Sequence, residues 1–320
     1  MAASMNRQAR WLICGTVPDE AFPLTQARWR RGGEQLFCEN AAAPNVAPLS
    51  IARGTPALVG ACLAVCEELA LSGPEVLLVG DTGTGEGSRA LYAHLAATVR
   101  EGGYDGIVFH YLFPDVDGHN RELMALEECA PRPLLFADAG FMYVAKMSGY
   151  ADHYDLFTPD VGELAFLADE TAPHPFYTRG FLLAEDNEVP ALVARACAGG
   201  NVARHLLVKG KTDYVYAGET LVASVDAPCV PFLEPIGGTG DIVAGLVTAF
   251  AMYGAGRELA LPEVCRLAAH AARLAGEAAH PNPATQVSEI MPWLGPAVAR
   301  ALETSGSGAE QGGQAGSHSR

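Results

Sequence analysis

The sequence predicts a layered α/β fold, in which helices cover both faces of a mostly parallel central sheet. From about Glu75 onward, short apolar runs that end at Gly, Asp or Pro alternate with longer stretches of helical character. Such runs are typical of strands that are buried on both faces of a parallel sheet. With 320 residues, 49% hydrophobic and 18% charged, the chain is long and apolar enough for one large α/β domain.

The alternation assigns the elements in chain order. The expected strands are Glu75–Val79, Gly106–Phe113, Pro133–Ala137, Asp155–Thr158 and His205–Lys209. The expected helices are Ser88–Arg100, Asn120–Cys129, Val189–Ala198 and Asp241–Tyr253. Two β-type runs flank Gly218 within Asp213–Asp226, which predicts a β-hairpin. Ligands of such sheets lie beyond the carboxyl ends of the strands, so we expect functional residues in the turns that follow them.

Composition divides the chain into three parts. Residues 51–303 are expected to form the catalytic domain, and residues 172–187, with two prolines and three aromatic residues, an insertion loop. Residues 1–50 lack the alternation and are expected to be an irregular extension. Residues 304–320 are rich in Gly, Ser and Gln with almost no apolar residues, which predicts a disordered tail.

Charge and hydropathy exclude several classes of partner. The net charge of −16 argues against non-specific binding of nucleic acid, which needs a basic surface. A nucleotide remains allowed, because a phosphate pocket needs only a few N–H groups and one or two cations. No apolar stretch is long enough for a membrane span, and the first residues make a poor signal peptide, so we expect a cytoplasmic protein. Homo-oligomerisation is left open.

The most informative segment is the glycine-rich turn Gly237–Asp241. Three glycines among four residues let the backbone approach a ligand closely, and the apolar stretch that follows reads as a helix. A helix that begins at such a turn directs free N–H groups and the positive end of its dipole at an anion. Asp241 suits either a structural N-cap or a base that faces an alcohol beside a phosphate, and the residues alone favour neither.

A second glycine-rich turn, Gly80–Ser88, follows an expected strand and precedes an expected helix. Its four glycines in eight residues also suit close approach to a ligand, although a plain strand-to-helix turn is the alternative. Neither turn matches the common phosphate-binding loop patterns. The loop at His110, Asp115, Asp117 and His119 carries metal-ligand residue types, but its spacing fits no helix face and a solvated loop is favoured.

The pattern Gly-Gly-Thr-Gly-Asp-x-x-x-Gly resembles the ribokinase-like superfamily, and within it the branch of the ADP- or ATP-dependent NAD(P)H-hydrate dehydratases. Four other segments resemble motifs of that branch in the same order, so that the resemblance covers residues 75–302. They are Val79–Ser88, Leu134–Phe141, Phe157–Leu164 and Leu206–Gly210. The resemblance implies a ribokinase-like three-layer α/β/α sandwich that uses Mg²⁺ and takes ADP or ATP as co-substrate.

Residue by residue, the resemblance implies a complete site. Asp241 would be the catalytic base, and Glu163 would help to hold Mg²⁺. The residues implied to bind the nucleotide and its phosphates are Lys209, Gly210, Asp213, Gly237, Gly238, Thr239 and Gly240. The residues implied to contact the substrate are Asp81, Gly83, Gly85, Ser88, Asp138 and Asp160.

The implied activity is dehydration of hydrated NAD(P)H, by phosphorylation of the hydroxyl group followed by elimination. Three departures affect the substrate side: Asp160 replaces the His or Asn of related families, Phe109–His119 replaces a glycine-rich turn, and 172–187 is inserted. The alternative is a small-molecule kinase that phosphorylates a sugar, nucleoside or vitamin alcohol. A non-catalytic nucleotide sensor is a third interpretation, which the presence of Lys209, Glu163 and Asp241 disfavours.

Overall fold

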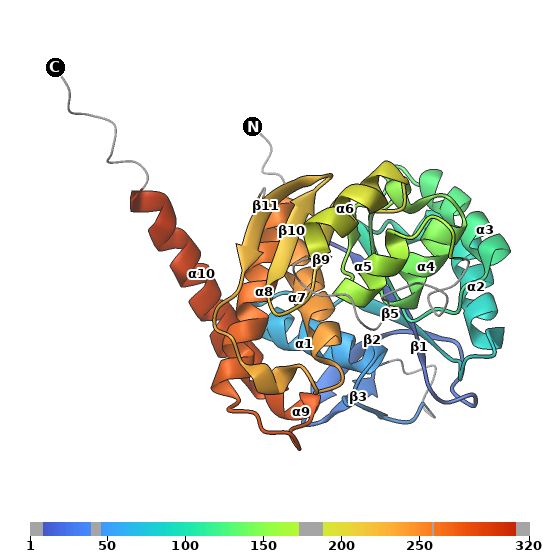
Figure 1. Cartoon of the computed structure of the whole chain (residues 1–320). Coiled ribbons are helices and arrows are strands. Elements are labelled where there is room, and N and C mark those ends of the chain that lie inside the picture. The colour runs from blue at the N-terminus through green and yellow to red at the C-terminus, as the bar shows by residue number, and fades with distance from the viewer. Residues whose placement is uncertain (1–8, 40–45, 173–187, 258, 312–320) are drawn as a thin grey trace, which may run out of the picture.

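The computed structural model describes residues 9–39, 46–172, 188–257 and 259–311 (Figure 1). Among these residues, eleven strands form one sheet in the order β11-β10-β9-β8-β7-β6-β1-β5-β2-β3-β4. The strands are β1 (Trp11–Val17), β2 (Thr25–Gly32), β3 (Gln35–Cys38), β4 (Leu49–Ser50), β5 (Glu75–Gly80), β6 (Gly106–His110), β7 (Leu134–Asp138), β8 (Leu156–Phe157), β9 (His205–Val208), β10 (Asp213–Ala217) and β11 (Thr220–Val225).

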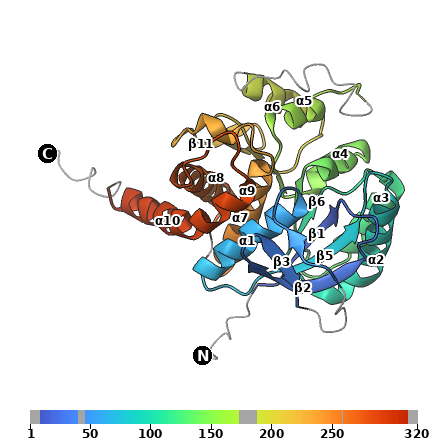
Figure 2. The same ribbon diagram turned by 90° about the horizontal axis from the view of Figure 1, so that it is seen from below.

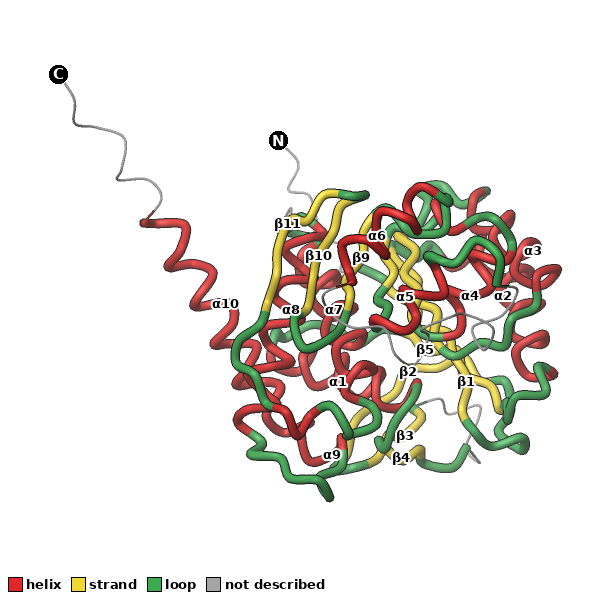
Figure 3. The backbone as a smooth tube through the Cα atoms, in the orientation of Figure 1, coloured by secondary structure: helices red, strands yellow, loops and turns green. Residues whose placement is uncertain are grey.

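The middle of the sheet is parallel and its two edges are antiparallel. The neighbours β5, β1, β6, β7, β8 and β9 pair in parallel. At one edge β10 and β11 form the predicted hairpin, and at the other edge β2, β3 and β4 extend the sheet from β5, each strand antiparallel to the one before (Figure 3). All parallel strands therefore direct their carboxyl ends toward one side of the molecule.

Helices cover both faces of this sheet. They are α1 (Thr55–Glu68), α2 (Glu86–Gly102), α3 (Val116–Glu127), α4 (Gly140–Met147), α5 (Val161–Leu167), α6 (Val189–Ala198), α7 (Thr239–Gly254), α8 (Leu261–Ala278), α9 (Val287–Ile290) and α10 (Leu294–Gln311). One hydrophobic cluster joins α1, α7, α8 and α10 to one face, and a second joins α2 to α6 to the other (Figure 2). The predicted three-layer α/β/α sandwich is confirmed. Among the described residues, none of the helices could cross a membrane.

The prediction that residues 1–50 form an irregular extension is wrong for the part that the structure describes. Strand β1 lies in the middle of the sheet, between β5 and β6. Trp11 and Ile13 belong to the hydrophobic cluster on one face, whereas Leu12 and Cys14 belong to the cluster on the other. Both faces of β1 are covered, so its sequence shows no polar alternation that would mark it as a strand.

The elements predicted from Glu75 onward are present, with shifted ends. Strand β6 stops at His110, three residues earlier than expected, because Tyr111 has a φ of +54° and leaves the extended conformation. The predicted tail is wrong for residues 304–311, which continue α10, and Arg266 of α8 donates a hydrogen bond to Ser305 there. Residues 312–320, and residues 173–187 of the expected insertion, lie outside the described residues.

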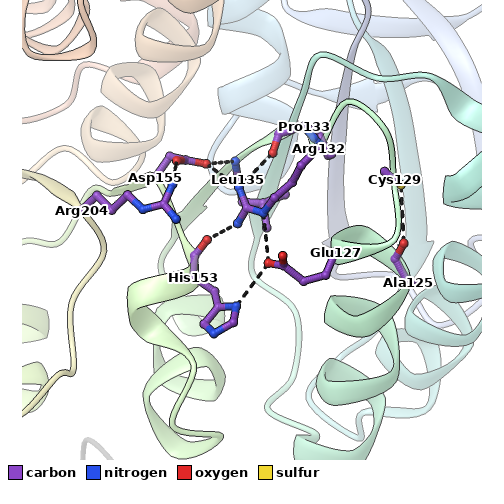
Figure 4. A network of polar contacts seen from close by, with 9 residues as sticks. All are labelled: Ala125, Glu127, Cys129, Arg132, Pro133, Leu135, His153, Asp155 and Arg204. Atoms are coloured by element: carbon purple, nitrogen blue, oxygen red, sulfur yellow. Dashed lines mark hydrogen bonds and ion pairs between the residues drawn. The ribbon is translucent and has the colours of Figure 1, made fainter.

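An ion-pair network ties the amino-terminal ends of the parallel strands together (Figure 4). Asp155, just before β8, is buried and accepts hydrogen bonds from Arg204 Nη1 at 2.8 Å, Arg132 Nη1 at 3.2 Å and the Leu135 N–H at 2.9 Å. Arg132 also donates to the carbonyl of His153. The network joins β7, β8 and β9 at the end of the sheet opposite the turns predicted to be functional.

Glu122 of α3 is a buried carboxyl group that makes no hydrogen bond with the described residues. Burial raises the pKa of Glu122 well above its usual value. The unfolded chain releases this proton above about pH 4.3, whereas the folded protein retains it. The carboxyl group therefore lowers the free energy of unfolding by up to ~1.4 kcal/mol for each pH unit above that value, until the folded pKa is reached.

We predict that Glu122→Met stabilises the protein, and by more at pH 8 than at pH 5. Methionine has a similar length and carries no charge that burial could penalise. Urea unfolding at both pH values measures the effect, with Glu101→Met on the exposed part of helix α2 as the control. If Glu122→Met changes the free energy of unfolding by the same amount at pH 5 and at pH 8, Glu122 ionises freely in the folded protein.

Candidate active site

Charged side chains meet at the carboxyl ends of the parallel strands β6, β7 and β9. His110 ends β6, Asp138 ends β7 and Lys209 follows β9 directly. Asp241, in the first turn of α7, lies against His110, and the amino-terminal end of α1 lies against Asp241. Residues far apart in the sequence are thus brought together at the edge where ligands of parallel sheets bind.

The glycine-rich turn Gly237–Asp241 forms the start of α7 and packs on the turn before α1. Gly238 has a φ of +101°, which an L-residue rarely adopts, and a Cβ there would lie 3.3 Å from Ala52 O. Among the described residues no side chain caps this helix end, and residues 237–240 are accessible. The turn therefore has the geometry of an anion site at a helix amino terminus.

Close packing of α1 on α7 brings their amino-terminal ends together. A Cβ at Gly245 would lie 2.4 Å from Leu58 O, so only glycine allows this approach. The last glycine of the Gly-Gly-Thr-Gly-Asp-x-x-x-Gly pattern therefore has a packing role, and the positive ends of two helix dipoles point toward Asp241.

Both carboxylate oxygens of Asp241 accept hydrogen bonds. Oδ2 accepts from the Gly54 N–H at 2.6 Å, and Oδ1 faces His110 Nε2 at 3.1 Å. Burial opposes ionisation, but the His110 and Gly54 hydrogen bonds and the charge of Lys209 outweigh it, so that the pKa of Asp241 falls below its usual value. Asp241 is accordingly ionised at neutral pH and can accept a proton.

His110 is a site residue that the sequence analysis missed. The ring is fully buried, with Nε2 on Asp241 and Nδ1 3.0 Å from Thr55 Oγ1. An ionised Asp241 only accepts, so Nε2 carries the proton, and in the neutral ring Nδ1 accepts from the Thr55 hydroxyl. The chain Thr55–His110–Asp241 fixes the orientation of the Asp241 carboxylate. The sequence placed His110 within the expected strand Gly106–Phe113 and named it as a residue of metal-ligand type, but gave no link to Asp241.

Lys209 joins Asp138 to the glycine-rich turn. Its Nζ donates to Asp138 Oδ1 at 2.8 Å, and a Cβ on Gly240 would lie 3.4 Å from the same Nζ. Burial lowers the pKa of Lys209, but the carboxylates of Asp138 and Glu163 raise it by more, which keeps the ammonium group charged. A fixed cation therefore lies beside the amino-terminal end of α7.

Asp160 and Glu163 form a capping box at the start of α5. The Glu163 N–H donates to Asp160 Oδ1 at 2.7 Å, and Glu163 Oε2 accepts from the Asp160 N–H at 2.8 Å. Burial and the Asp160 carboxylate raise the pKa of Glu163 to about 8, against the effect of Lys209. Carboxylates held this close repel each other, and oxygen donors are the ligands that Mg²⁺ prefers, so the pair fits a divalent cation.

The predicted substrate turn is held together by its own hydrogen bonds. Asp81 Oδ1 accepts from the N–H groups of Gly83 and Gly85, and its Oδ2 accepts from the N–H and hydroxyl of Ser88. These bonds hold the pKa of Asp81 below its usual value although burial raises it. The interactions of Asp81 and Ser88 shape the turn, so contact with substrate through their side chains stays a prediction.

Gly210 and Asp213 close the turn after Lys209. Asp213 Oδ1 accepts from the Gly210 N–H at 3.1 Å, and its Oδ2 accepts from Arg273 Nε at 2.7 Å. Arg273, on α8, also donates to the carbonyls of Gly210 and Lys211. Asp213 thus fixes the turn that follows Lys209 by bonding to both its backbone and Arg273. Helix α8 looks like a packing helix in sequence, which hid the role of Arg273.

The metal-ligand types in the His110–His119 loop do not come together. Asp115 caps α3, and the buried His119 lies with Nε2 2.9 Å from Tyr154 Oη. His110, Asp138 and Asp241 do offer ligand atoms within 4.8 Å of one another, as a metal site would. The hydrogen bonds of His110 to Thr55 and Asp241, and the ion pair of Asp138 with Lys209, account for that arrangement without an ion.

Solved structures of several kinases share this fold. The chain is similar to ribokinase from Cryptococcus neoformans in complex with ADP (TM-score 0.53, 18% identity, 91% of this chain and 99% of that one). It is also similar to Arabidopsis thaliana ribokinase complexed with ribose and ATP (0.51, 16%, 92% and 99%). A third is phosphofructokinase-2 from Escherichia coli in complex with fructose-6-phosphate (0.50, 12%, 91% and 100%). The predicted ribokinase-like fold is confirmed.

No model of a protein family matches the chain. One protein of Methanocaldococcus jannaschii, described as uncharacterized protein MJ1337, is 37% identical over 247 residues, which span 77% of this chain and 98% of that protein. The aligned length and the identity show a common family. The chain therefore belongs to the family of MJ1337 and has the ribokinase-like fold.

Proposed function

We propose that the protein transfers a phosphoryl group from a nucleotide to the hydroxyl group of a small molecule. The observation that carries the proposal is an ionised, oriented Asp241 at the start of α7, beside a charged Lys209. Phosphoryl transfer needs positioning and neutralisation of charge more than covalent catalysis. A base, a helix amino terminus and a cation in one place meet these needs.

In the proposed reaction, Asp241 takes the proton of the acceptor hydroxyl. The acceptor oxygen then forms a bond to the terminal phosphorus of the nucleotide, and the bond from that phosphorus to the bridging oxygen breaks. The electron pair stays on the nucleotide product, so protons and charges balance. The N–H groups at the start of α7 and the ammonium group of Lys209 stabilise the charge on the transferred group.

A divalent cation is expected to take part, and Asp160 and Glu163 are the residues that would hold it. Mg²⁺ would supply neutralisation of the nucleotide phosphates. The raised pKa of Glu163 supports this assignment, because a cation would relieve the repulsion between the two carboxylates.

The comparisons favour this kinase function over dehydration of hydrated NAD(P)H. The named structural relatives are kinases of a sugar or a sugar phosphate, and one was solved with ribose and ATP. The substrate-side departures at Asp160 and Phe109–His119 also point away from the dehydratase branch. Nucleotide as co-substrate follows from the same relatives and from Lys209 at the phosphate turn.

The proposal is tested by nucleotide consumption with Mg²⁺ and a panel of sugars, nucleosides and vitamin alcohols. Turnover of ATP or ADP that depends on one acceptor, and that Asp241→Asn lowers about a hundredfold or more, is the expected result. Hydrated NADH belongs in the same panel. Recovery of NADH absorbance there, without an acceptor-dependent phosphate ester, would favour the dehydratase instead.

His110 is expected to act as a positioning residue for Asp241. His110→Ala removes a hydrogen bond to a charged group, which lowers kcat about tenfold. The pKa of Asp241 should rise, so the acid limb of the kcat profile moves to higher pH. His110→Gln can still place an N–H donor near Asp241 and should recover part of both effects. An unshifted pH profile in His110→Ala would contradict the role.

A further inference from the structure

Two exposed aromatic side chains flank the candidate active site, directly after β6. Tyr111 is 47% exposed and Phe113 is 39% exposed, whereas Leu112 between them is buried. These residues, here called the aromatic segment Tyr111–Phe113, follow the strand residue His110 directly. Exposed aromatic rings gain little from packing, so their place at the site calls for another explanation.

The aromatic segment is held rigidly by three side-chain hydrogen bonds. Thr16 Oγ1 donates to Tyr111 O at 2.7 Å, the Phe113 N–H donates to Ser88 Oγ at 2.9 Å, and Tyr92 Oη donates to Phe113 O at 3.1 Å. These bonds fix both ends of the segment, and the buried Leu112 anchors its middle. The two rings are therefore presented in fixed positions before any ligand binds, which lowers the entropy that binding must overcome.

Tyr111 adopts an unfavourable backbone conformation to reach this position. Its φ of +54° is uncommon for a residue with a side chain, and aromatic residues adopt it less readily than Asn or Gly. Backbone strain of this kind persists where the surrounding structure imposes it, and it gathers at ligand sites. A glycine at position 111 would adopt this φ without strain. The strain is therefore tolerated in order to place the Tyr111 side chain here.

Both rings adjoin groups of the site. The Tyr111 ring stands edge-on to the His110 ring, with centroids 4.5 Å apart and planes at 89°. His110 is also the residue that holds the Asp241 carboxylate, with Nε2 3.1 Å from Asp241 Oδ1, so the Tyr111 ring lies next to that contact. Phe113 packs on the other side, where a Cβ at Gly85 would lie 2.7 Å from its ring. The aromatic segment thus connects the Gly80–Ser88 turn to Asp241.

We propose that the aromatic segment Tyr111–Phe113 is a stacking surface for the acceptor, and that the acceptor is an alcohol carried by a planar, neutral or cationic ring. Offset stacking on a fixed ring would place a hydroxymethyl group of such a molecule beside Asp241. The nearby carboxylates of Asp138 and Asp241 disfavour an anionic ring. The inference rests on the proposed phosphotransferase function, because Asp241 defines which end of the molecule reacts.

Binding of matched alcohols tests the stacking surface without turnover. Benzyl alcohol and cyclohexylmethanol differ in planarity but have similar size, and nicotinyl alcohol and para-hydroxymethylbenzoate differ in the charge that the ring can carry. Dissociation constants from NMR titration of the full chain should favour benzyl alcohol over cyclohexylmethanol roughly fivefold. Nicotinyl alcohol should bind more tightly than the benzoate.

Three variants separate stacking from other effects. Tyr111→Ala should reduce the preference for the planar alcohol to about one, and Tyr111→Phe should retain it, because the ring remains. Trp293→Ala, which removes an exposed aromatic ring of the 3-10 helix Met291–Trp293, serves as the matched control and should change nothing. The inference is overturned if the wild-type protein binds neither alcohol, or binds benzyl alcohol and cyclohexylmethanol equally well. It is also overturned if Tyr111→Ala keeps the preference for benzyl alcohol.

The same panel distinguishes failure of the inference from failure of the proposed function. Phosphorylation of a non-aromatic sugar that is unaffected by Tyr111→Ala would retain the phosphotransferase and remove the stacking surface. Binding of planar alcohols that depends on Tyr111, with no phosphate transfer to any acceptor in the panel, would retain the stacking surface and remove the phosphotransferase.

Discussion

Asp241→Asn is expected to lower kcat by a factor of about one hundred to ten thousand, the range that general-base catalysis contributes. Asparagine has the same shape and can accept the Gly54 hydrogen bond, but it cannot take a proton from the acceptor. Because Lys209 and the N–H groups at the start of α7 remain, nucleotide affinity should change by less than about threefold. Steady-state kinetics with the identified acceptor and calorimetric titration of nucleotide measure the two quantities.

The matched control is Asp152→Asn, in the 3-10 helix Ala151–His153 that precedes β8 at the opposite end of the sheet. Asp152 is exposed, so its substitution should leave both kcat and stability unchanged. Full activity of Asp241→Asn would remove the proposed base. A large drop in Tm would show that Asp241→Asn also impairs folding. In that case, an unchanged nucleotide affinity of the folded fraction would show that the loss of kcat in that fraction comes from catalysis.

Asp155→Ala is expected to destabilise the protein by about 3 kcal/mol. The substitution leaves two arginines without their shared carboxylate and the buried Leu135 N–H without an acceptor. Asp155 joins β7 to β9, whose far ends carry Asp138 and Lys209, so unfolding should remove the active site with the rest of the domain. Guanidinium unfolding gives the free energy.

Two companion variants identify the source of that loss. Arg204 is 58% exposed, so Arg204→Ala should cost less than about 1 kcal/mol. Asp155→Asn keeps an acceptor for the Leu135 N–H, so its loss of stability should lie between those of Asp155→Ala and Arg204→Ala. If Asp155→Ala cost no more than Arg204→Ala, the buried network would not be a major source of stability.

The layered fold could be predicted because buried parallel strands and amphipathic helices leave different periodicities. The order of motifs also located the start of α7, Asp138 and Lys209 at one edge of the sheet. Strand β1 escaped prediction for a physical reason. Its partners β5 and β6 lie far away in the sequence, and a short apolar run that is covered on both faces looks like any other apolar run.

The missed site residues act through contacts that the sequence does not display. His110 becomes meaningful only when Thr55 and Asp241 are placed on its two ring nitrogens. Arg273 acts from a helix whose buried residues are otherwise apolar or small. Conversely, the hydrogen bonds of Asp81 and the capping box of Asp160 show that polar residues in turns can shape the backbone, which sequence alone could not distinguish from substrate contact.

Identification of the reaction product tests the proposed phosphoryl transfer most directly. The protein would be incubated with Mg²⁺, nucleotide and the acceptor that supports turnover, and the products analysed by phosphorus NMR and mass spectrometry. We predict a phosphate monoester of the acceptor in amounts equal to the nucleotide consumed, present with wild type and lost with Asp241→Asn. Release of inorganic phosphate without an ester, or an ester formed equally well by Asp241→Asn, would contradict it.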